Sequence, residues 1–161
     1  MPVVIRPAEP RDREILVEQF LRLNEYERRI ASNRRTGRPG AEMDLDAALG
    51  RIEATDGVAL VAEVRGRVVG HLFLTFEHAA SYVREEMRPY ACVTQLFVSE
   101  DVRGGGVGTM LMNEAESLAA RRGLRRIMVG VLAGNPPAER LYSMLGYEPH
   151  AIELEKAIAP L

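Results

Sequence analysis

The apolar residues of this chain recur with two different periods, and these periods divide the sequence into alternating helices and strands. Between residues 10 and 31, Ile15, Leu16, Phe20, Leu23 and Ile30 recur at helical spacing and predict an amphipathic helix. Similar patterns and their end signals predict helices over 10–31, 44–55, 107–122 and 135–146. Short apolar runs bounded by turn residues predict strands over 3–8, 58–64, 68–77, 91–98, 124–132 and 147–158.

The residues between these segments predict how they connect. The short "RGR" between two strands predicts a hairpin, and the Gly- and Pro-rich segment 32–40 predicts a polar loop. Asp44 is the N-cap candidate of the second helix, and Asn135 followed by Pro136 opens the last one. This order of elements predicts a central mixed, mostly antiparallel α/β sheet of six to seven strands, flanked by about four helices.

Composition limits the classes of function. We expect residues 1–161 to form a single domain. The net charge of −2 gives no indication of a nucleic acid or an anionic membrane as partner. With Cys92 as the sole cysteine, neither an internal disulfide nor a cysteine-based zinc site can form, and no other spacing indicates a metal. The apolar runs are too short for a signal peptide or a membrane span, so we expect a cytoplasmic protein.

The stretch "VRGGGVGTML" (102–111) is the strongest chemical signal in the chain. Glycine costs a helix about 1 kcal/mol relative to alanine, so four glycines at a helix start require a reason. A strand followed by a Gly-rich turn and a helix exposes unpaired backbone N–H groups, which bind phosphate. The stretch matches neither GxxxxGK[ST] nor GxGxxG.

Two segments resemble the GNAT superfamily of N-acetyltransferases. Arg103, Gly106 and Gly108 occupy the positions of its acyl-CoA signature R/Q-x-x-G-x-G/A, and "NPPAERLYSMLGYE" resembles its last helix. The resemblance covers roughly residues 92–150 and implies a domain that binds acetyl-CoA. It implies pyrophosphate on the amides of 103–109, and a pantetheine arm beside a strand that carries a bulge near its end and diverges from strand 124–132. The implied cofactor-binding residues are Leu96, Phe97, Val98, Arg103, Gly104, Gly105, Gly106, Val107, Gly108, Thr109 and Asn135.

Acyl transfer to an amine needs an oxyanion donor, a proton for the departing thiolate and a neutral amine. A backbone N–H near Phe97 or Val98 is the expected oxyanion donor. Tyr142 matches the tyrosine that protonates the thiolate in the family, although its helical spacing from Ala138 and Leu145 also suits a packing residue. By the same resemblance, Asn135 hydrogen-bonds the pantetheine arm, and it can cap its helix as well.

The general base is not identified by the sequence. Many family members have a glutamate at the position of Thr94, where neither Thr94 nor its neighbour Gln95 can accept a proton near pH 7. The candidates elsewhere are Glu63, His71, Glu77 and His78, each of which also suits a structural or surface role. Alternatively, the acceptor amine is weakly basic and arrives neutral.

We expect an acetyl-CoA-dependent N-acetyltransferase that acts on a small-molecule or peptide amine. The acceptor is expected between segment 31–43, the second helix and segment 78–90, whose arginines indicate an anionic acceptor: Arg34, Arg35, Arg38, Arg84 and Arg88. Glu85 and Glu86 are too few to indicate a cationic one. The alternatives are a non-catalytic acyl-CoA-binding module and a protein lysine or N-terminal acetyltransferase. The resemblance is also compatible with a homodimer through the C-terminal strands.

Overall fold

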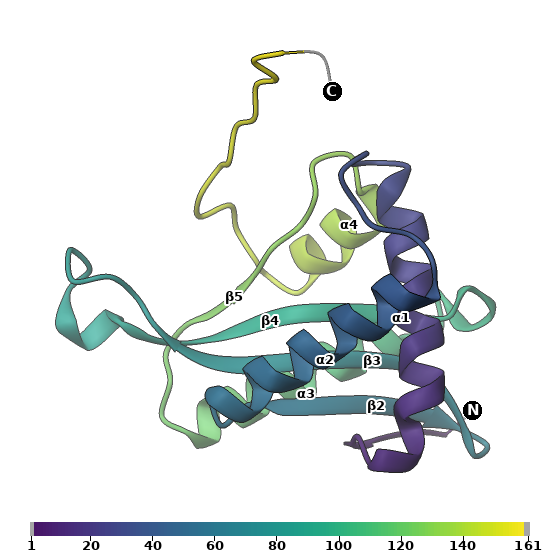
Figure 1. Ribbon diagram of the computed structural model, residues 1–161. Helices are drawn as coiled ribbons and strands as arrows, with labels where there is room; N and C mark the ends of the chain where they lie inside the picture. The colour runs from purple at the N-terminus through teal and green to yellow at the C-terminus, as the bar shows by residue number, and fades with distance from the viewer. Residues whose placement is uncertain (1, 160–161) are drawn as a thin grey trace.

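Five strands form one sheet in the computed structural model, which describes residues 2–159 (Figure 1). The strands lie in the order of the sequence: β1 (Val3–Pro7), β2 (Val58–Val64), β3 (Arg67–His78), β4 (Pro89–Val98) and β5 (Ile127–Val129). Neighbouring strands are antiparallel except β4 and β5, which are parallel. The ends of the expected domain, residues 1 and 160–161, lie outside the described residues.

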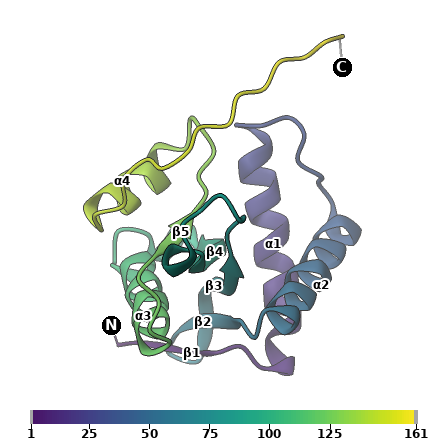
Figure 2. The ribbon, with the colours of Figure 1, turned by 90° about the vertical axis from the view of Figure 1, so that its left-hand side faces the viewer.

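Helices cover both faces of the sheet (Figure 2). One face carries α1 (Arg13–Arg28) and α2 (Arg38–Ala54), and the other carries α3 (Val107–Arg121) and α4 (Pro136–Met144). Single turns of 3-10 helix lie at Pro10–Asp12, Glu85–Met87 and Glu100–Val102.

Alternation along the strands fills two cores, one on each face of the sheet. Leu72 of β3 packs in the core that includes Leu111 of α3, whereas its neighbour Phe73 packs with Phe20 of α1 and Leu45 of α2. Successive side chains of a strand point to opposite faces, so one strand supplies both cores. The sheet is thereby held between α1–α2 and α3–α4.

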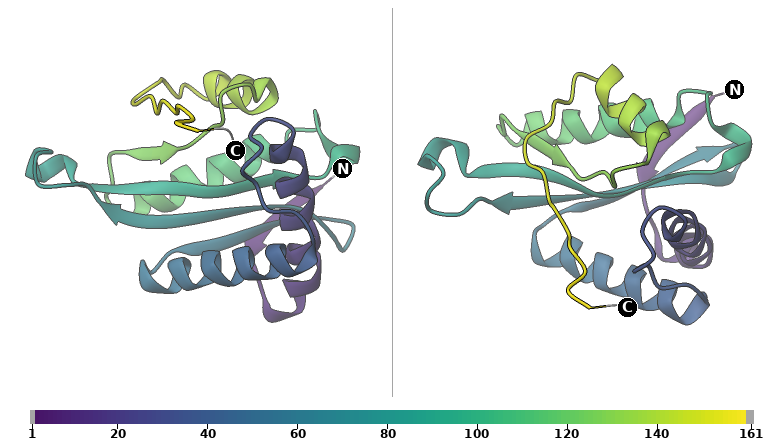
Figure 3. Two further views of the ribbon diagram at one scale, coloured as in Figure 1. Left: turned by 45° about the horizontal axis from the view of Figure 1, so that its top comes forward. Right: turned by 90° about the horizontal axis from the view of Figure 1, so that it is seen from above.

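The expected six to seven strands are corrected to five. Segment 147–158 forms no strand, and its Ile152 and Leu154 are 82% and 93% exposed. In Figure 3 this segment runs as an extended trace after α4. Its alternation of apolar and charged residues is typical of a strand, but a strand forms only where a neighbour supplies hydrogen bonds. The last strand of the sheet, β5, is short, and its pairing with β4 ends at Val129. It therefore offers segment 147–158 little edge to pair with.

The second helix begins at Arg38 rather than at Asp44. Pro39 suits its first turn, and the Arg38 guanidinium bonds to Glu42 one turn on and to Glu14 of α1. The Asp44 carboxylate instead accepts hydrogen bonds from Asn24 and Arg35. Contacts between the two helices, which the local pattern does not contain, therefore move the start of the helix into the expected loop.

Candidate active site

The Gly-rich turn presents free backbone donors at the start of α3. The first hydrogen bond of the helix runs from Met110 N–H to Gly106 C=O at 2.9 Å. The N–H groups of Val107, Gly108 and Thr109 precede that bond and have no helical partner. Those of Gly104 and Gly106 make no backbone hydrogen bond within residues 2–159 either.

Two of the amides expected to bind pyrophosphate are already engaged. Arg103 N–H bonds to Glu100 C=O at 3.2 Å, and Gly105 N–H bonds to Val102 C=O at 3.2 Å. These bonds close the turn and leave the other five amides without a backbone partner among residues 2–159. A diphosphate group would therefore contact the N–H groups of Gly104, Gly106, Val107, Gly108 and Thr109.

The glycines serve different purposes. Gly104 and Gly106 have φ angles of +77° and +82°, which L side chains rarely adopt. A Cβ at Gly108 would lie 3.1 Å from Leu141 Cδ2, so this glycine lets α3 approach α4. The density of glycine thus reflects the turn and the helix packing as well as access to the amides.

The strand that precedes this turn has one free edge. β4 and β5 pair over three positions only, Ala91–Ile127, Cys92–Met128 and Val93–Val129. On its other edge, β4 stays paired with β3 as far as Val98. The register shifts between Phe73 and Leu74 leave Thr94 as the extra residue of a bulge, in the middle of the strand rather than near its end. Beyond this bulge, residues 94–98 form the free edge of β4.

Strand geometry identifies the backbone groups that face this free edge. Ser99 N–H bonds to Val69 C=O, so it points toward β3. Because N–H directions alternate along a strand, the N–H groups of Leu96 and Val98 point to the free edge and that of Phe97 does not. Val98 C=O is occupied by the Arg103 side chain, whose Nε donates to it at 3.0 Å.

Tyr142 of α4 is a packed residue with an unused hydroxyl. The side chain is 9% exposed, and its ring centroid lies 6.0 Å from that of Tyr147. The hydroxyl makes no hydrogen bond within the described chain. Burial, with a smaller contribution from the charge of Glu27, raises the pKa of Tyr142 to about 12. The phenol is therefore protonated at neutral pH and can donate.

The end of α1 lies close to α4 and to the residues that precede it. We call this region the α1–α4 seam (Tyr26, Glu27 and Ile30 with Gly134, Asn135 and Tyr142). Tyr26 OH donates to Asn135 Oδ1 at 3.2 Å, and the same oxygen accepts from Ala138 N–H at 3.5 Å. Asn135 is thus the N-cap of α4, as expected. Arg103 Cζ lies 5.7 Å from the centroid of the Tyr26 ring, which links the seam to the Gly-rich turn.

A family model described as the acetyltransferase (GNAT) family matches residues 20–147. The chain belongs to this family. Residues 20–147 include the second half of α1, the β4–turn–α3 unit and α4, so the match covers the parts of the site described above.

Two relatives agree with this assignment, and a solved structure shares the fold. The uncharacterized N-acetyltransferase MJ1207 of Methanocaldococcus jannaschii is 35% identical over 88 residues, which are 55% of this chain and 38% of that protein. A mycothiol acetyltransferase of Saccharomonospora viridis is 36% identical over 93 residues, 58% of this chain and 30% of that protein. The match therefore spans about a third of the length of these curated relatives. A structure of the BH1408 protein from Bacillus halodurans superposes with a TM-score of 0.83 at 18% identity, covering 96% of this chain and 99% of that one.

Acetyl-CoA, the co-substrate of the GNAT family, fits the residues present. Five amides without a backbone partner suit a diphosphate, and the free edge of β4 can accept an extended amide chain as an added strand. Within residues 2–159, no group of three or more His, Cys, Asp or Glu side chains could hold a metal ion. In the same part of the chain, no helix is both long and apolar enough to cross a membrane.

None of the four candidate bases lies beside Tyr142 and the free edge. Glu63 is paired with Arg6 at the β1–β2 edge of the sheet. Glu77 and His78 pair with the start of β4, about 25 Å along the strand from its end, where they line a hollow of about 410 Å³. The Arg51 guanidinium binds Glu77 at 2.7 Å, and the pKa of Glu77 is lowered although burial alone would raise it.

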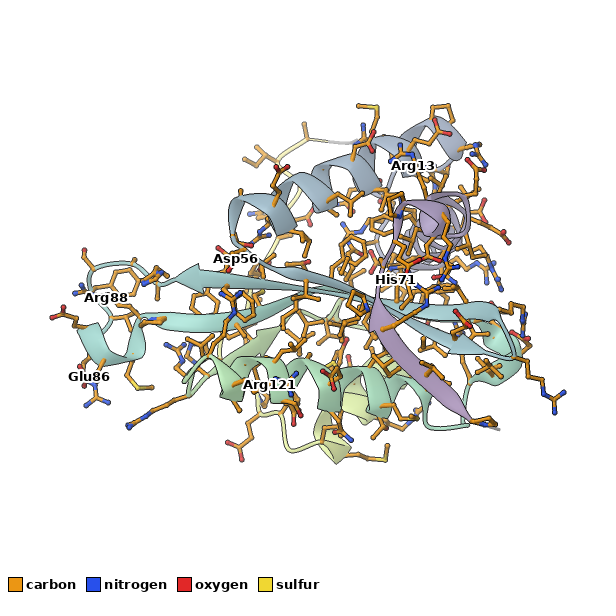
Figure 4. All side chains as sticks on the ribbon, turned by 90° about the horizontal axis from the view of Figure 1, so that it is seen from below. Arg13, Asp56, His71, Glu86, Arg88 and Arg121 are labelled. Atoms are coloured by element: carbon orange, nitrogen blue, oxygen red, sulfur yellow. The ribbon has the colours of Figure 1, made fainter. Side chains whose placement is uncertain are left out.

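His71 is a core residue. It is fully buried beneath α1 (Figure 4), and its ring stacks on Phe20 and Phe97 with centroid distances of 5.0 and 5.8 Å. Its Nδ1 lies 2.8 Å from Gln19 Oε1, while Gln19 Nε2 donates to Val68 C=O. Because the Gln19 oxygen faces Nδ1, Nδ1 carries the ring proton and donates it to this oxygen. The other ring nitrogen, Nε2, carries no proton and has no hydrogen-bond partner among residues 2–159. Burial lowers the pKa of His71 to about 3, which excludes it as a base near pH 7.

The arginines expected to bind an anionic acceptor instead bind carboxylates and backbone carbonyls of the protein itself. Arg34, Arg35 and Arg38 pair with Glu27, Asp44 and Glu14 at 2.7–2.9 Å. Arg88 donates to the carbonyls of Ser81 and Val83, and Arg84 pairs with Glu86. The 78–90 segment also lies at the opposite end of the sheet from the α1–α4 seam (Figure 1). These five side chains therefore do not converge on one site.

Sequence reasoning missed Tyr26 and Glu27. Both lie on the face of α1 that carries Leu23 and Ile30, at the spacing of three and four residues that had marked the buried stripe. A polar pair inside an apolar stripe, near the end of a helix, is the signal that could have found them.

Proposed function

We propose that this protein transfers the acetyl group of acetyl-CoA to a primary amine by direct attack in a ternary complex. The observation that supports the proposal most is the combination of three features: five amides without a backbone partner in the Gly-rich turn and the first turn of α3, the free edge of β4, and the unused Tyr142 hydroxyl. Each corresponds to one requirement of the reaction: anchoring of the diphosphate, alignment of the thioester, and a donor to the departing thiolate.

The residues of the chain have distinct roles in this proposal. The amides of Gly104 and of residues 106–109 bind diphosphate, and the pantetheine arm lies along residues 94–98. A Leu96 or Val98 N–H donates to the thioester oxygen as negative charge develops on it. Phe97 acts through its ring, which packs against His71 and holds the end of β4 in place. Asn135 remains available to the pantetheine arm through its side-chain amide.

Thiol release in the presence of acetyl-CoA and a panel of primary amines tests the proposal. We expect release to depend on the amine, with the acetylated amine identified by mass spectrometry. Calorimetry with acetyl-CoA alone is the companion measurement. Acetyl-CoA binding without acetylation of any amine would contradict the enzyme and favour an acyl-CoA-binding module. Acetylation of peptides but not of small amines would favour a protein acetyltransferase.

A further inference from the structure

Glu27 is the carboxylate that the α1–α4 seam brings toward Tyr142. The helix face that carries it is fixed on both sides. Tyr26, one residue earlier, donates to Asn135, and Ile30 Cγ2 lies 3.6 Å from the position of a Cβ at Gly134. Glu27 thus faces the segment that leads into α4, and its negative charge contributes to the raised pKa of Tyr142.

Glu27 has a partner that can be exchanged. Arg34 Nε donates to Glu27 Oε2 at 2.7 Å, and Arg34 comes from the link between α1 and α2 rather than from a helix or strand. The side chains of Glu27 and Arg34 are 24% and 33% exposed, so solvent reaches the pair. Ion pairs that solvent reaches contribute little to stability, so a competing ammonium group can displace the guanidinium.

We propose that Glu27 binds the ammonium group of the acceptor and takes its proton, with Arg34 holding the carboxylate until the amine arrives. This inference rests on the proposed function and names the base that the strands do not supply. It also assigns the acceptor to the cationic primary amines, because a carboxylate that exchanges a guanidinium partner binds an ammonium group by the same charge complementarity.

The proton balance of the step is complete. Glu27 accepts one proton from the ammonium group and later releases it to solvent. The freed nitrogen lone pair forms the bond to the thioester carbon, and the C–S bond breaks with its electron pair on sulfur. Tyr142 gives its proton to that sulfur while it takes the second proton from the acylated nitrogen. The products are an amide and a thiol, and one proton is released.

Two substitutions at the pair give opposite expectations. With spermidine, tobramycin and tyramine as probes, Glu27→Gln lowers kcat/KM at least a hundredfold for whichever amines the unmodified protein acetylates. Arg34→Gln lowers the KM for the amine by up to about fivefold, because the competing guanidinium is gone. Glu25→Gln, exposed on the same helix, is the matched control and has no effect.

The result that would overturn the inference is equal loss in Glu27→Gln and Arg34→Gln, which would mean that the ion pair acts only structurally. A Glu27→Gln variant with unchanged kcat/KM would also overturn it. Where the unmodified protein acetylates none of the three amines, calorimetric binding of spermidine to the protein saturated with coenzyme A decides. Binding that is lost in Glu27→Gln supports the ammonium site while contradicting the transferase, and an absence of such binding overturns the site.

Discussion

Acid should destabilise this protein through a single buried imidazole. His71 has a pKa of about 3 in the folded state because burial disfavours its charged form, whereas the ordinary value is 6.5. His71 therefore binds more protons in the unfolded chain than in the folded chain between pH 3 and 6.5. Stability from the neutral ring is fully present above pH 6.5 and is lost as the pH falls below that value.

The size of the effect follows from the two pKa values. Each pH unit below 6.5 costs about 1.36 kcal/mol, so the loss reaches about 2.7 kcal/mol at pH 4.5. The assay is urea denaturation of the unmodified protein and of His71→Gln at pH 7.5, 6.5, 5.5 and 4.5. All the other ionisable groups are present in both proteins, so their contributions cancel in the difference between the two unfolding free energies.

We expect the stability advantage of the unmodified protein over His71→Gln to shrink by about 2.7 kcal/mol across that range. A difference that stays constant with pH would refute the reasoning, because His71 would then titrate equally in both states. NMR of the His71 ring provides an independent check and should show no titration between pH 8 and 5. A ring that titrates near pH 6.5 would reopen His71 as a candidate base.

Three further predictions concern the turn, α4 and the edge of the sheet. Gly106→Ala places a side chain at φ +82°, which costs about 1 kcal/mol of stability and weakens acetyl-CoA binding by tenfold or more in calorimetry. The control is Gly123→Ala, which introduces the same strain at φ +73° beyond the other end of α3, and equal acetyl-CoA binding by the two variants would contradict the site. Tyr142→Phe removes a hydroxyl without a hydrogen bond, so kcat falls about a hundredfold while the melting temperature and acetyl-CoA affinity persist; a large loss of affinity would mean that the residue is structural. Asp12→Asn breaks the pair with Arg6, whose hydrogen bonds lower the pKa of Asp12, and costs about 2 kcal/mol of stability from pH 5 to 8. This contribution is lost as the pH falls below the ordinary value of 3.8 and through the lowered pKa, so a cost that does not shrink in acid would contradict the assignment.

The sequence was most informative where local chemistry decides the structure. Glycines at positive φ and an Asn-Pro helix start depend on near neighbours, so the Gly-rich turn, α3 and the start of α4 were predicted within one or two residues. The burial of His71 between apolar strand residues was likewise expected from its surroundings in the sequence.

The remaining features depend on contacts between distant segments. The start of α2 is set by Arg38 binding to Glu14 of another helix, and the absence of a strand in 147–158 reflects a missing neighbour. The bulge at Thr94 is visible only in the register of β4 against β3. The position of Glu27 near Tyr142 was not predicted, because α4 lies more than a hundred residues later in the chain.

The central claim is that five backbone amides of the Gly-rich turn bind the diphosphate of the coenzyme. The direct measurement is a titration of ¹⁵N-labelled protein with coenzyme A, followed by amide NMR shifts. We predict the largest shifts at Gly104, Gly106, Val107, Gly108 and Thr109, with smaller ones at Arg103 and Gly105, whose N–H groups are bonded within the turn. Saturating coenzyme A that leaves those five amides unmoved while others shift would contradict the claim.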